Sequence, residues 1–135
     1  MAELQPGLSK EILLTVTEAI TAKHMGSGTL AVLATPSMIA LMEGTSHQMV
    51  APFLTPQQST VGVLVNVRHL AATPLGMAIR IHSELVAVEG RKLTFQVEAY
   101  DTVEKIGEGV HERFVIDLAR FQDRLKRKTE GKLTS

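Results

Sequence analysis

The segment over residues 35–50 constrains the fold of this chain more than any other part of the sequence. Thr35 and Pro36 are typical of a helix start, because threonine can cap free backbone N–H groups and proline is tolerated at the first helical position. The apolar side chains that follow are Met38, Ile39, Leu41, Met42, Met49 and Val50. They are spread widely around the cylinder, which predicts a long helix that is buried on most sides.

Segments with the pattern of β-strands surround this helix. Residues 11–23 are rich in β-branched side chains and predict a first strand. Residues 59–69 carry a valine at every second position from Val61 to Val67, the pattern of a strand with one buried face, and His69 falls on the same parity. Further strands are predicted over residues 76–88, 93–101 and 106–116.

A short helix is predicted over residues 118–128, with Leu118, Phe121 and Leu125 on one face. The order of a strand, a buried helix and consecutive antiparallel strands predicts an α+β domain in which one sheet wraps a central helix. Such a sheet leaves one face and one edge uncovered. Pairing of an edge strand with a second copy of the chain would cover that edge.

Composition excludes several classes of protein. The chain has 135 residues, which is roughly one domain. It has no cysteine, which excludes disulfide scaffolds, thiolate zinc sites and cysteine nucleophiles. Its 14 basic residues balance 14 acidic ones and only 4% of residues are aromatic, so a dedicated nucleic-acid-binding surface is disfavoured. With no signal peptide or membrane span recognisable, we expect a soluble, cytoplasmic protein.

Three polar residues are candidates for chemistry. Glu43 lies in the apolar run MIALMEG, where it is either a general base or nucleophile in a pocket or part of a solvent-facing stripe. His69 is either catalytic or a satisfied core histidine. Thr35 is either functional or only a helix cap. Taken singly, none of the three specifies a reaction.

Other features indicate less. The five histidines have no metal-ligand spacing, and neither a phosphate-binding loop nor a GxSxG serine-hydrolase motif is present, so we predict no metal and no cofactor. Basic residues gather near the end of the chain at Arg120, Arg124, Lys126, Arg127 and Lys128. They form either a solvated helix end or a weak phosphate contact.

Four segments of the chain carry a family pattern. They are ATPSMIALMEG, TVGVLVNVRHLAATPLGM, VEGRKLTFQVEAYD and IGEGVHERFVI, which together run over residues 34–116. In order and spacing they resemble the hot-dog fold thioesterases of the fluoroacetyl-CoA thioesterase type. The resemblance implies a single hot-dog domain over residues 1–135, with a long central helix wrapped by an antiparallel β-sheet. It also implies a homodimer with active sites near the subunit interface.

The resemblance assigns roles to five residues. It implies that Thr35, Glu43 and His69 are catalytic and that Gly62 and Arg113 bind substrate. Glu43 would either attack the thioester carbonyl or activate water, and His69 would act as general acid and base. Because Gly62 has no side chain, a substrate could approach its backbone N–H closely.

The function expected from this resemblance is hydrolysis of a short- or medium-chain acyl-CoA to a free acid and coenzyme A. The fluoroacetyl group is not carried over, because residues 24–30 (HMGSGTL) lack the bulky aromatic side chains expected ahead of the helix. The alternatives are a non-catalytic acyl-CoA-binding or sensing domain and a hot-dog hydratase. We expect no nucleic-acid or membrane partner, and in a chain of zero net charge a local patch must hold the phosphates of coenzyme A.

Overall fold

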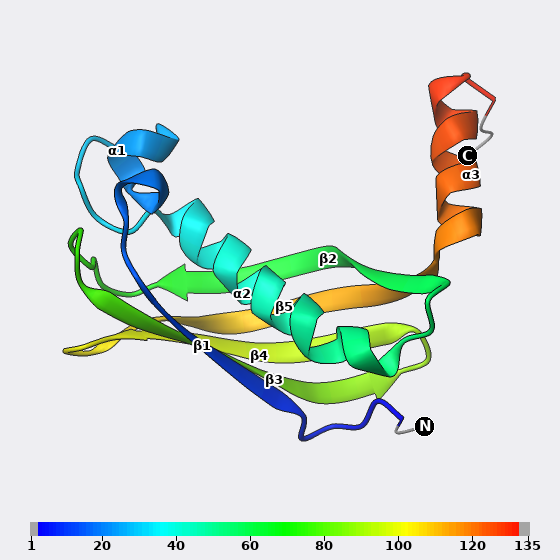
Figure 1. Ribbon diagram of the computed structural model, residues 1–135, viewed down its shortest axis with the longest axis horizontal. Coiled ribbons are helices and arrows are strands. Elements are labelled where there is room, and N and C mark those ends of the chain that lie inside the picture. The colour runs from blue at the N-terminus through cyan, green and yellow to red at the C-terminus, as the bar shows by residue number, and fades with distance from the viewer. Residues whose placement is uncertain (1–2, 133–135) are drawn as a thin grey trace.

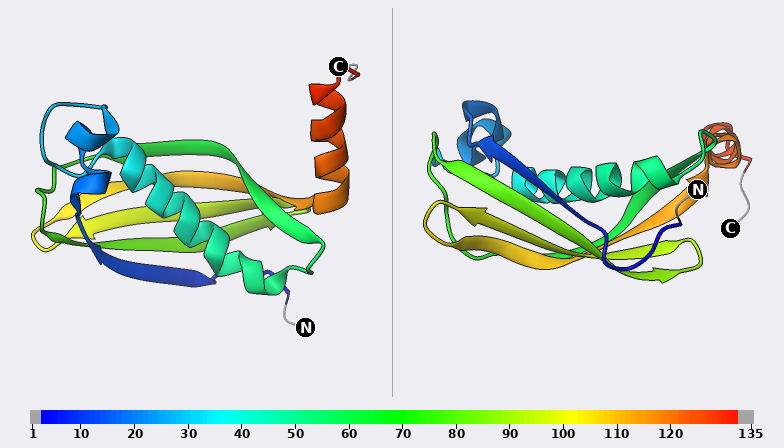
Figure 2. Two further views of the ribbon diagram at one scale, coloured as in Figure 1. Left: turned by 45° about the horizontal axis from the view of Figure 1, so that its top comes forward. Right: turned by 60° about the horizontal axis from the view of Figure 1, so that its bottom comes forward.

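A five-stranded antiparallel sheet curls around one long helix in the computed structural model, which describes residues 3–132 (Figures 1 and 2). The strands are β1 (Ser9–Thr15), β2 (Gln58–His69), β3 (Ala78–Glu89), β4 (Lys92–Asp101) and β5 (Lys105–Asp117). The helices are α1 (Ala22–Met25), α2 (Thr35–Val50) and α3 (Leu118–Thr129), with the 3₁₀ turns η1 (Glu18–Ile20) and η2 (Ala51–Phe53). The strands lie in the order β1-β3-β4-β5-β2. The predicted α+β architecture is confirmed, and β2 to β5 begin and end within two residues of their predicted bounds.

The helix α2 lies in the concave face of the sheet and buries one side against it (Figure 2). Its buried residues are Ser37, Met38, Met42, Thr45, Ser46, Met49 and Val50. The two predicted core positions Ile39 and Leu41 are only half-buried. The expectation of a helix buried on most sides is therefore wrong for the single protomer, because one sheet covers one helix face and leaves the opposite face open.

The first strand ends at Thr15, well before the predicted end at residue 23. The residues after it form short helical turns. The side chain of Thr21 accepts a hydrogen bond from the His24 backbone N–H at 3.3 Å and caps α1. A β-branched residue that favours a strand by composition thus serves as a helix cap instead.

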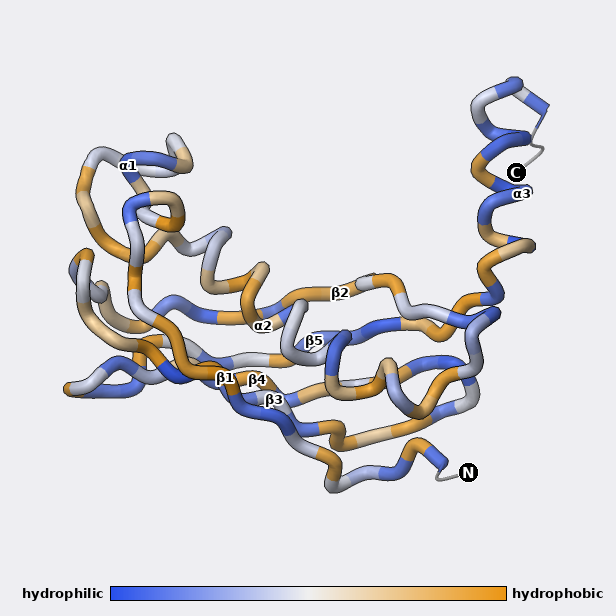
Figure 3. The backbone as a smooth tube through the Cα atoms, in the orientation of Figure 1, coloured by the Kyte–Doolittle hydropathy of each residue, from blue (hydrophilic) through white to orange (hydrophobic). Residues whose placement is uncertain are grey.

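The strand β2 forms an edge of the sheet, and its valines are not buried as predicted. A β-bulge at Val63 shifts the alternation, so that Gly62 pairs with Arg113 and Val65 pairs with His111. Residues paired across a ladder share one face, which places both Gly62 and Val65 on the face of the sheet that α2 covers. The most exposed apolar residues of the strand are Val63 (50%), Leu64 (42%) and Val65 (40%). Figure 3 shows this hydrophobic stretch along β2.

The helix α3 projects from the end of β5 rather than packing on the sheet (Figure 1). The Asp117 carboxylate caps it by accepting the Arg120 backbone N–H at 3.1 Å. No residue of α3 is buried, and Leu125 exposes 49% of its surface. Among residues 3–132, no helix has the length and apolar character needed to cross a membrane.

Candidate active site

Thr35 and His69 form the first polar group of the site. The Thr35 Oγ1 and His69 Nδ1 atoms are 2.7 Å apart, which joins the start of α2 to the end of β2. Both side chains line a cavity of about 410 Å³. The N-cap of α2 is Ala34, which makes no side-chain cap hydrogen bond. The capping role predicted for Thr35 is therefore wrong. Thr35 is itself the first residue of the helix, and its hydroxyl group forms a hydrogen bond with His69.

The environment of His69 keeps the imidazole neutral. Burial lowers the pKa of His69 below its ordinary value of 6.5, and the backbone of Ala71 opposes this shift. Its Nε2 atom is buried and has no hydrogen-bond partner among residues 3–132. Because Thr35 holds Nδ1, Nε2 is the ring nitrogen that keeps a free hydrogen-bonding position among residues 3–132.

Glu43 belongs to a second polar group, further along the same helix. Its carboxylate oxygen Oε2 lies 3.8 Å from Nη1 of Arg113, and the side chain is 39% exposed. Eight residues of α-helix separate Thr35 from Glu43, a rise of about 12 Å. Within one protomer, Glu43 makes no hydrogen bond or ion pair with Thr35 or His69 among the described contacts, and it does not line their cavity.

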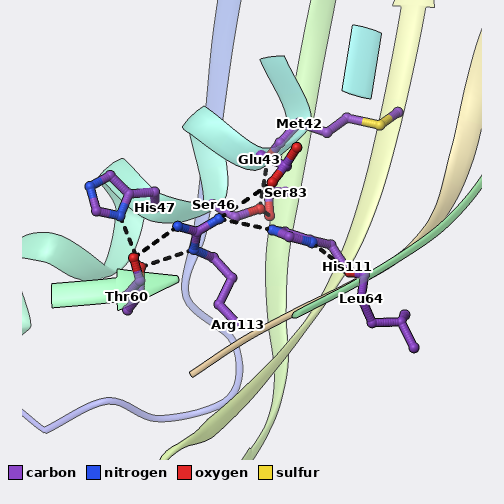
Figure 4. A network of polar contacts seen from close by, with 9 residues as sticks. All are labelled: Met42, Glu43, Ser46, His47, Thr60, Leu64, Ser83, His111 and Arg113. Atoms are coloured by element: carbon purple, nitrogen blue, oxygen red, sulfur yellow. Dashed lines mark hydrogen bonds and ion pairs between the residues drawn. The ribbon is translucent and has the colours of Figure 1, made fainter. Parts of the chain in front are cut away.

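Arg113 anchors this second group and is only 8% exposed. Its Nε donates to Thr60 Oγ1 at 2.9 Å and its Nη2 donates to the Thr60 carbonyl at 3.0 Å. Its Nη1 donates to His111 Nε2 at 3.2 Å and faces Glu43, as Figure 4 shows. His111 Nδ1 donates to the Leu64 carbonyl at 2.8 Å. All three nitrogens of the guanidinium group therefore form hydrogen bonds, and Nη1 also faces the Glu43 carboxylate.

The hydrogen bonds of His111 determine its tautomer. A carbonyl oxygen can only accept, so the proton is on Nδ1 and Nε2 accepts from Arg113. Burial lowers the pKa of His111, and the positive charge of Arg113 lowers it further, whereas the backbone of Leu64 and the carboxylates of Glu43 and Glu112 oppose the shift. The ring is therefore a neutral acceptor that fixes the guanidinium.

Gly62 lies directly against this carboxylate. A Cβ atom at Gly62 would be 2.9 Å from Glu43 Oε2 and 3.3 Å from both Arg113 Nη1 and His111 Cε1. Real Cβ atoms do not approach other atoms as closely as the first distance, so any side chain here would displace the carboxylate. The glycine leaves the Glu43 oxygen accessible beside the backbone of β2.

Sequence reasoning missed three members of this network, namely His47, Thr60 and His111. His47 Nδ1 hydrogen-bonds Thr60 Oγ1 at 2.9 Å, and burial together with the Arg113 charge lowers the pKa of His47. The spacing of these two histidines from the candidate site residues could have indicated them. His47 is four residues after Glu43 on one helix face, and His111 is two residues before Arg113 on one strand face.

Comparison with solved structures defines the class of protein. The chain matches a structure of the fluoroacetyl-CoA thioesterase FlK with a TM-score of 0.88 and 34% identity, over 94% of this chain and 98% of that one. It also matches a threonine-to-serine mutant of FlK in complex with acetyl-CoA, with a TM-score of 0.87 and 34% identity, over 93% and 99% of the two chains. The fold is that of the hot-dog thioesterases, as predicted.

Sequence comparison specifies the family. The model of the fluoroacetyl-CoA-specific thioesterase family matches residues 16–119. A fluoroacetyl-CoA thioesterase from Streptantibioticus cattleyicolor is 43% identical over 98 residues, which are 73% of this chain and 70% of that protein. The chain belongs to the fluoroacetyl-CoA-specific thioesterase family, and it is a thioester hydrolase of the acyl-CoA thioesterase class.

Proposed function

We propose that this chain hydrolyses the thioester of a short- or medium-chain acyl-CoA to a free acid and coenzyme A. The observation that carries the proposal is the Glu43 carboxylate held beside Arg113 and the side-chain-free Gly62. The acetyl-CoA complex of the mutant relative supports a coenzyme A thioester as the ligand class. The fluoroacetyl group is not assigned to this chain, because residues 24–30 contain no aromatic side chain.

Glu43 is the group that we propose to act on the thioester carbonyl. It either attacks the carbonyl carbon to form an acyl-enzyme anhydride, which water then hydrolyses, or it removes a proton from the water that attacks. In both routes the carbon–sulfur bond breaks and coenzyme A leaves as a thiolate, which needs little protonation because a thiol pKa is roughly 8.5. In the first route neutral His69 takes the proton of the water that hydrolyses the anhydride, and in the second it passes the proton from Glu43 to the departing thiolate. In both routes the Gly62 backbone stabilises the oxyanion.

We further infer that two copies of the chain complete each site. Glu43 is about 12 Å of helix rise from Thr35, so one protomer keeps the carboxylate apart from the Thr35–His69 pair. The edge strand β2 is apolar and exposed at Val63 and Leu64. Antiparallel pairing of two such edges brings the end of one β2 toward the Gly62 portion of the other. Each site would then combine Glu43 of one protomer with His69 of the partner subunit.

A cytoplasmic location is part of the same proposal. The cysteine-free composition suits a reducing compartment. Microscopy of the tagged full-length chain in its own cell type tests this point, and a signal outside the cytoplasm would contradict it.

A thiol-release assay over acyl-CoAs of increasing chain length tests the proposed reaction. We expect release of coenzyme A in step with free acid, and loss of that release in Glu43→Gln. Saturable binding of acyl-CoA without released thiol would instead indicate an acyl-CoA-binding domain. Consumption of an unsaturated acyl-CoA without released thiol would indicate hydratase chemistry.

A further inference from the structure

A groove at the base of α3 gathers arginines that the thioester chemistry does not use. It has a volume of about 380 Å³ and lies between α3, the end of β5 and the turn that joins β3 to β4. Three arginines line it, Arg91 from the turn and Arg120 and Arg124 from α3. The two on α3 are four residues apart and therefore share one helix face.

The positive charge of this groove is not neutralised within the protomer. Among residues 3–132, none of the three arginines forms an ion pair with a carboxylate. The groove lining includes an acidic residue, Asp117. Its Oδ1 atom accepts a hydrogen bond from the Arg120 backbone N–H at 3.1 Å. Arg91 is fixed against β5 by a hydrogen bond from Nη1 to the Val115 carbonyl at 3.3 Å. In a chain with zero net charge, this is a local site for an anion.

The remaining walls of the groove are apolar. They are formed by Val115, Ile116 and Phe121. Phe121 is half-buried and is one of only four phenylalanines in the chain. An apolar floor with an aromatic ring and a rim of guanidinium groups suits a phosphorylated nucleotide, because the base can stack while the planar guanidinium groups bind phosphate oxygens in pairs.

The groove lies at the end of β5, the strand that also carries Arg113 of the candidate site. Gly62 pairs with Arg113, and Gln58 pairs with Asp117 at the edge of the groove. Four residues of β5 therefore separate the two places, a distance of about 13 Å along the strand. The flexible pantetheine arm of coenzyme A joins a thioester at one end to phosphates at the other and can bridge such a separation.

We propose that this groove binds the phosphate groups of coenzyme A through Arg91, Arg120 and Arg124. The inference rests on the proposed function, since it assigns the non-reacting end of the same substrate. It also gives a role to α3, which is charged, has no buried residue and follows the end of the β2–β5 ladder that carries Arg113.

The experiment compares two substrates with the same acyl group, an acyl-CoA and the matching acyl-pantetheine, which lacks the phosphates. For Arg120→Gln combined with Arg124→Gln, we expect KM for the acyl-CoA to rise about tenfold for each arginine, with kcat little changed. KM for the acyl-pantetheine should stay at the wild-type value. The control is Lys126→Gln combined with Arg127→Gln, which removes the same two positive charges from the same helix at residues that do not line the groove.

Two outcomes would overturn the phosphate site. One is an unchanged KM for acyl-CoA in the double variant while the wild type hydrolyses acyl-CoA, which would leave the proposed function intact. The other is an equal rise in KM for both substrates. Calorimetric binding of coenzyme A itself, with pantetheine for comparison, tests the groove even if the chain releases no thiol. Weaker binding of coenzyme A in the double variant supports the site, and equal binding contradicts it.

Discussion

Gly62 and Glu43 approach each other so closely that one added carbon at Gly62 would lie 2.9 Å from the Glu43 carboxylate oxygen. A side chain at position 62 would therefore force the carboxylate end of the Glu43 side chain to move. In this position the carboxylate lies 3.8 Å from Nη1 of Arg113.

Gly62→Ala should lower kcat for thioester hydrolysis by about 10²-fold, because the methyl group displaces the Glu43 carboxylate from its position. Steady-state kinetics with the preferred acyl-CoA measures this. The matched control is Gly44→Ala on the same helix, where an added carbon meets nothing within 4 Å. Wild-type kcat in Gly62→Ala would show that the carboxylate position does not limit the reaction.

Mixing two inactive variants should restore activity if the sites are shared between protomers. In a Glu43→Gln dimer both sites lack the carboxylate, and in a His69→Asn dimer both sites lack the imidazole. After subunit exchange, a mixed dimer regains one site, formed by Glu43 of the His69→Asn chain and His69 of the Glu43→Gln chain. We expect recovery approaching one quarter of wild-type activity in an equal mixture, because about half of the dimers are mixed and each has one of two sites. If the mixture stays inactive although exchange is demonstrated, the sites lie within single protomers.

Thr35→Val should reduce kcat by about tenfold while leaving stability nearly unchanged. The valine removes the hydrogen bond of 2.7 Å to His69 Nδ1, but the N-cap of α2 is Ala34 and loses nothing. Thr35→Ser keeps the hydroxyl and should retain most of the activity. A large fall in the urea midpoint of Thr35→Val, with kcat unaffected, would instead support a capping role.

His111→Phe should lower the free energy of unfolding by about 2 kcal/mol. Phenylalanine fills the ring position against Phe95, whose centroid lies 5.9 Å from that of His111. It leaves the Leu64 carbonyl and one Arg113 N–H without their hydrogen-bond partners. Urea denaturation followed by far-UV circular dichroism measures the change. Equal or greater stability would mean that water replaces both hydrogen bonds at little cost.

Stability should decrease as the pH falls below about 6.5. Burial lowers the pKa of His47, His69 and His111 below their ordinary 6.5. The unfolded chain therefore binds protons near pH 6.5 that the folded chain does not bind until lower pH, so the free energy of unfolding is highest above 6.5 and falls through the folded pKa values. Denaturant midpoints between about pH 5 and 8 measure this. The decrease in the free energy of unfolding with falling pH should be smaller in His69→Asn than in the wild type. A wild-type free energy that does not change with pH would contradict the prediction.

Local signals in the sequence were sufficient for the regular elements. The proline at position 36 and the apolar pattern after it predict α2 with its observed bounds, because both act within a few residues. The turn before β4 has the positive φ of 63° at Gly90 that a tight hairpin favours. The bulge at Val63 and the edge position of β2 could not be predicted, since both depend on which strand lies alongside.

For the site, the sequence by itself determined which residues carry reactive groups, and the family pattern singled out four of them together with Gly62. Only the tertiary structure decided how they are grouped. It joined Thr35 to His69, and it placed Glu43 with Arg113, His111 and Thr60. The physical reason is distance along the chain. The hydrogen bonds that hold Arg113 and His111 connect residues 53 and 47 positions apart, so no local spacing encodes them, and they form only when the sheet closes around its helix.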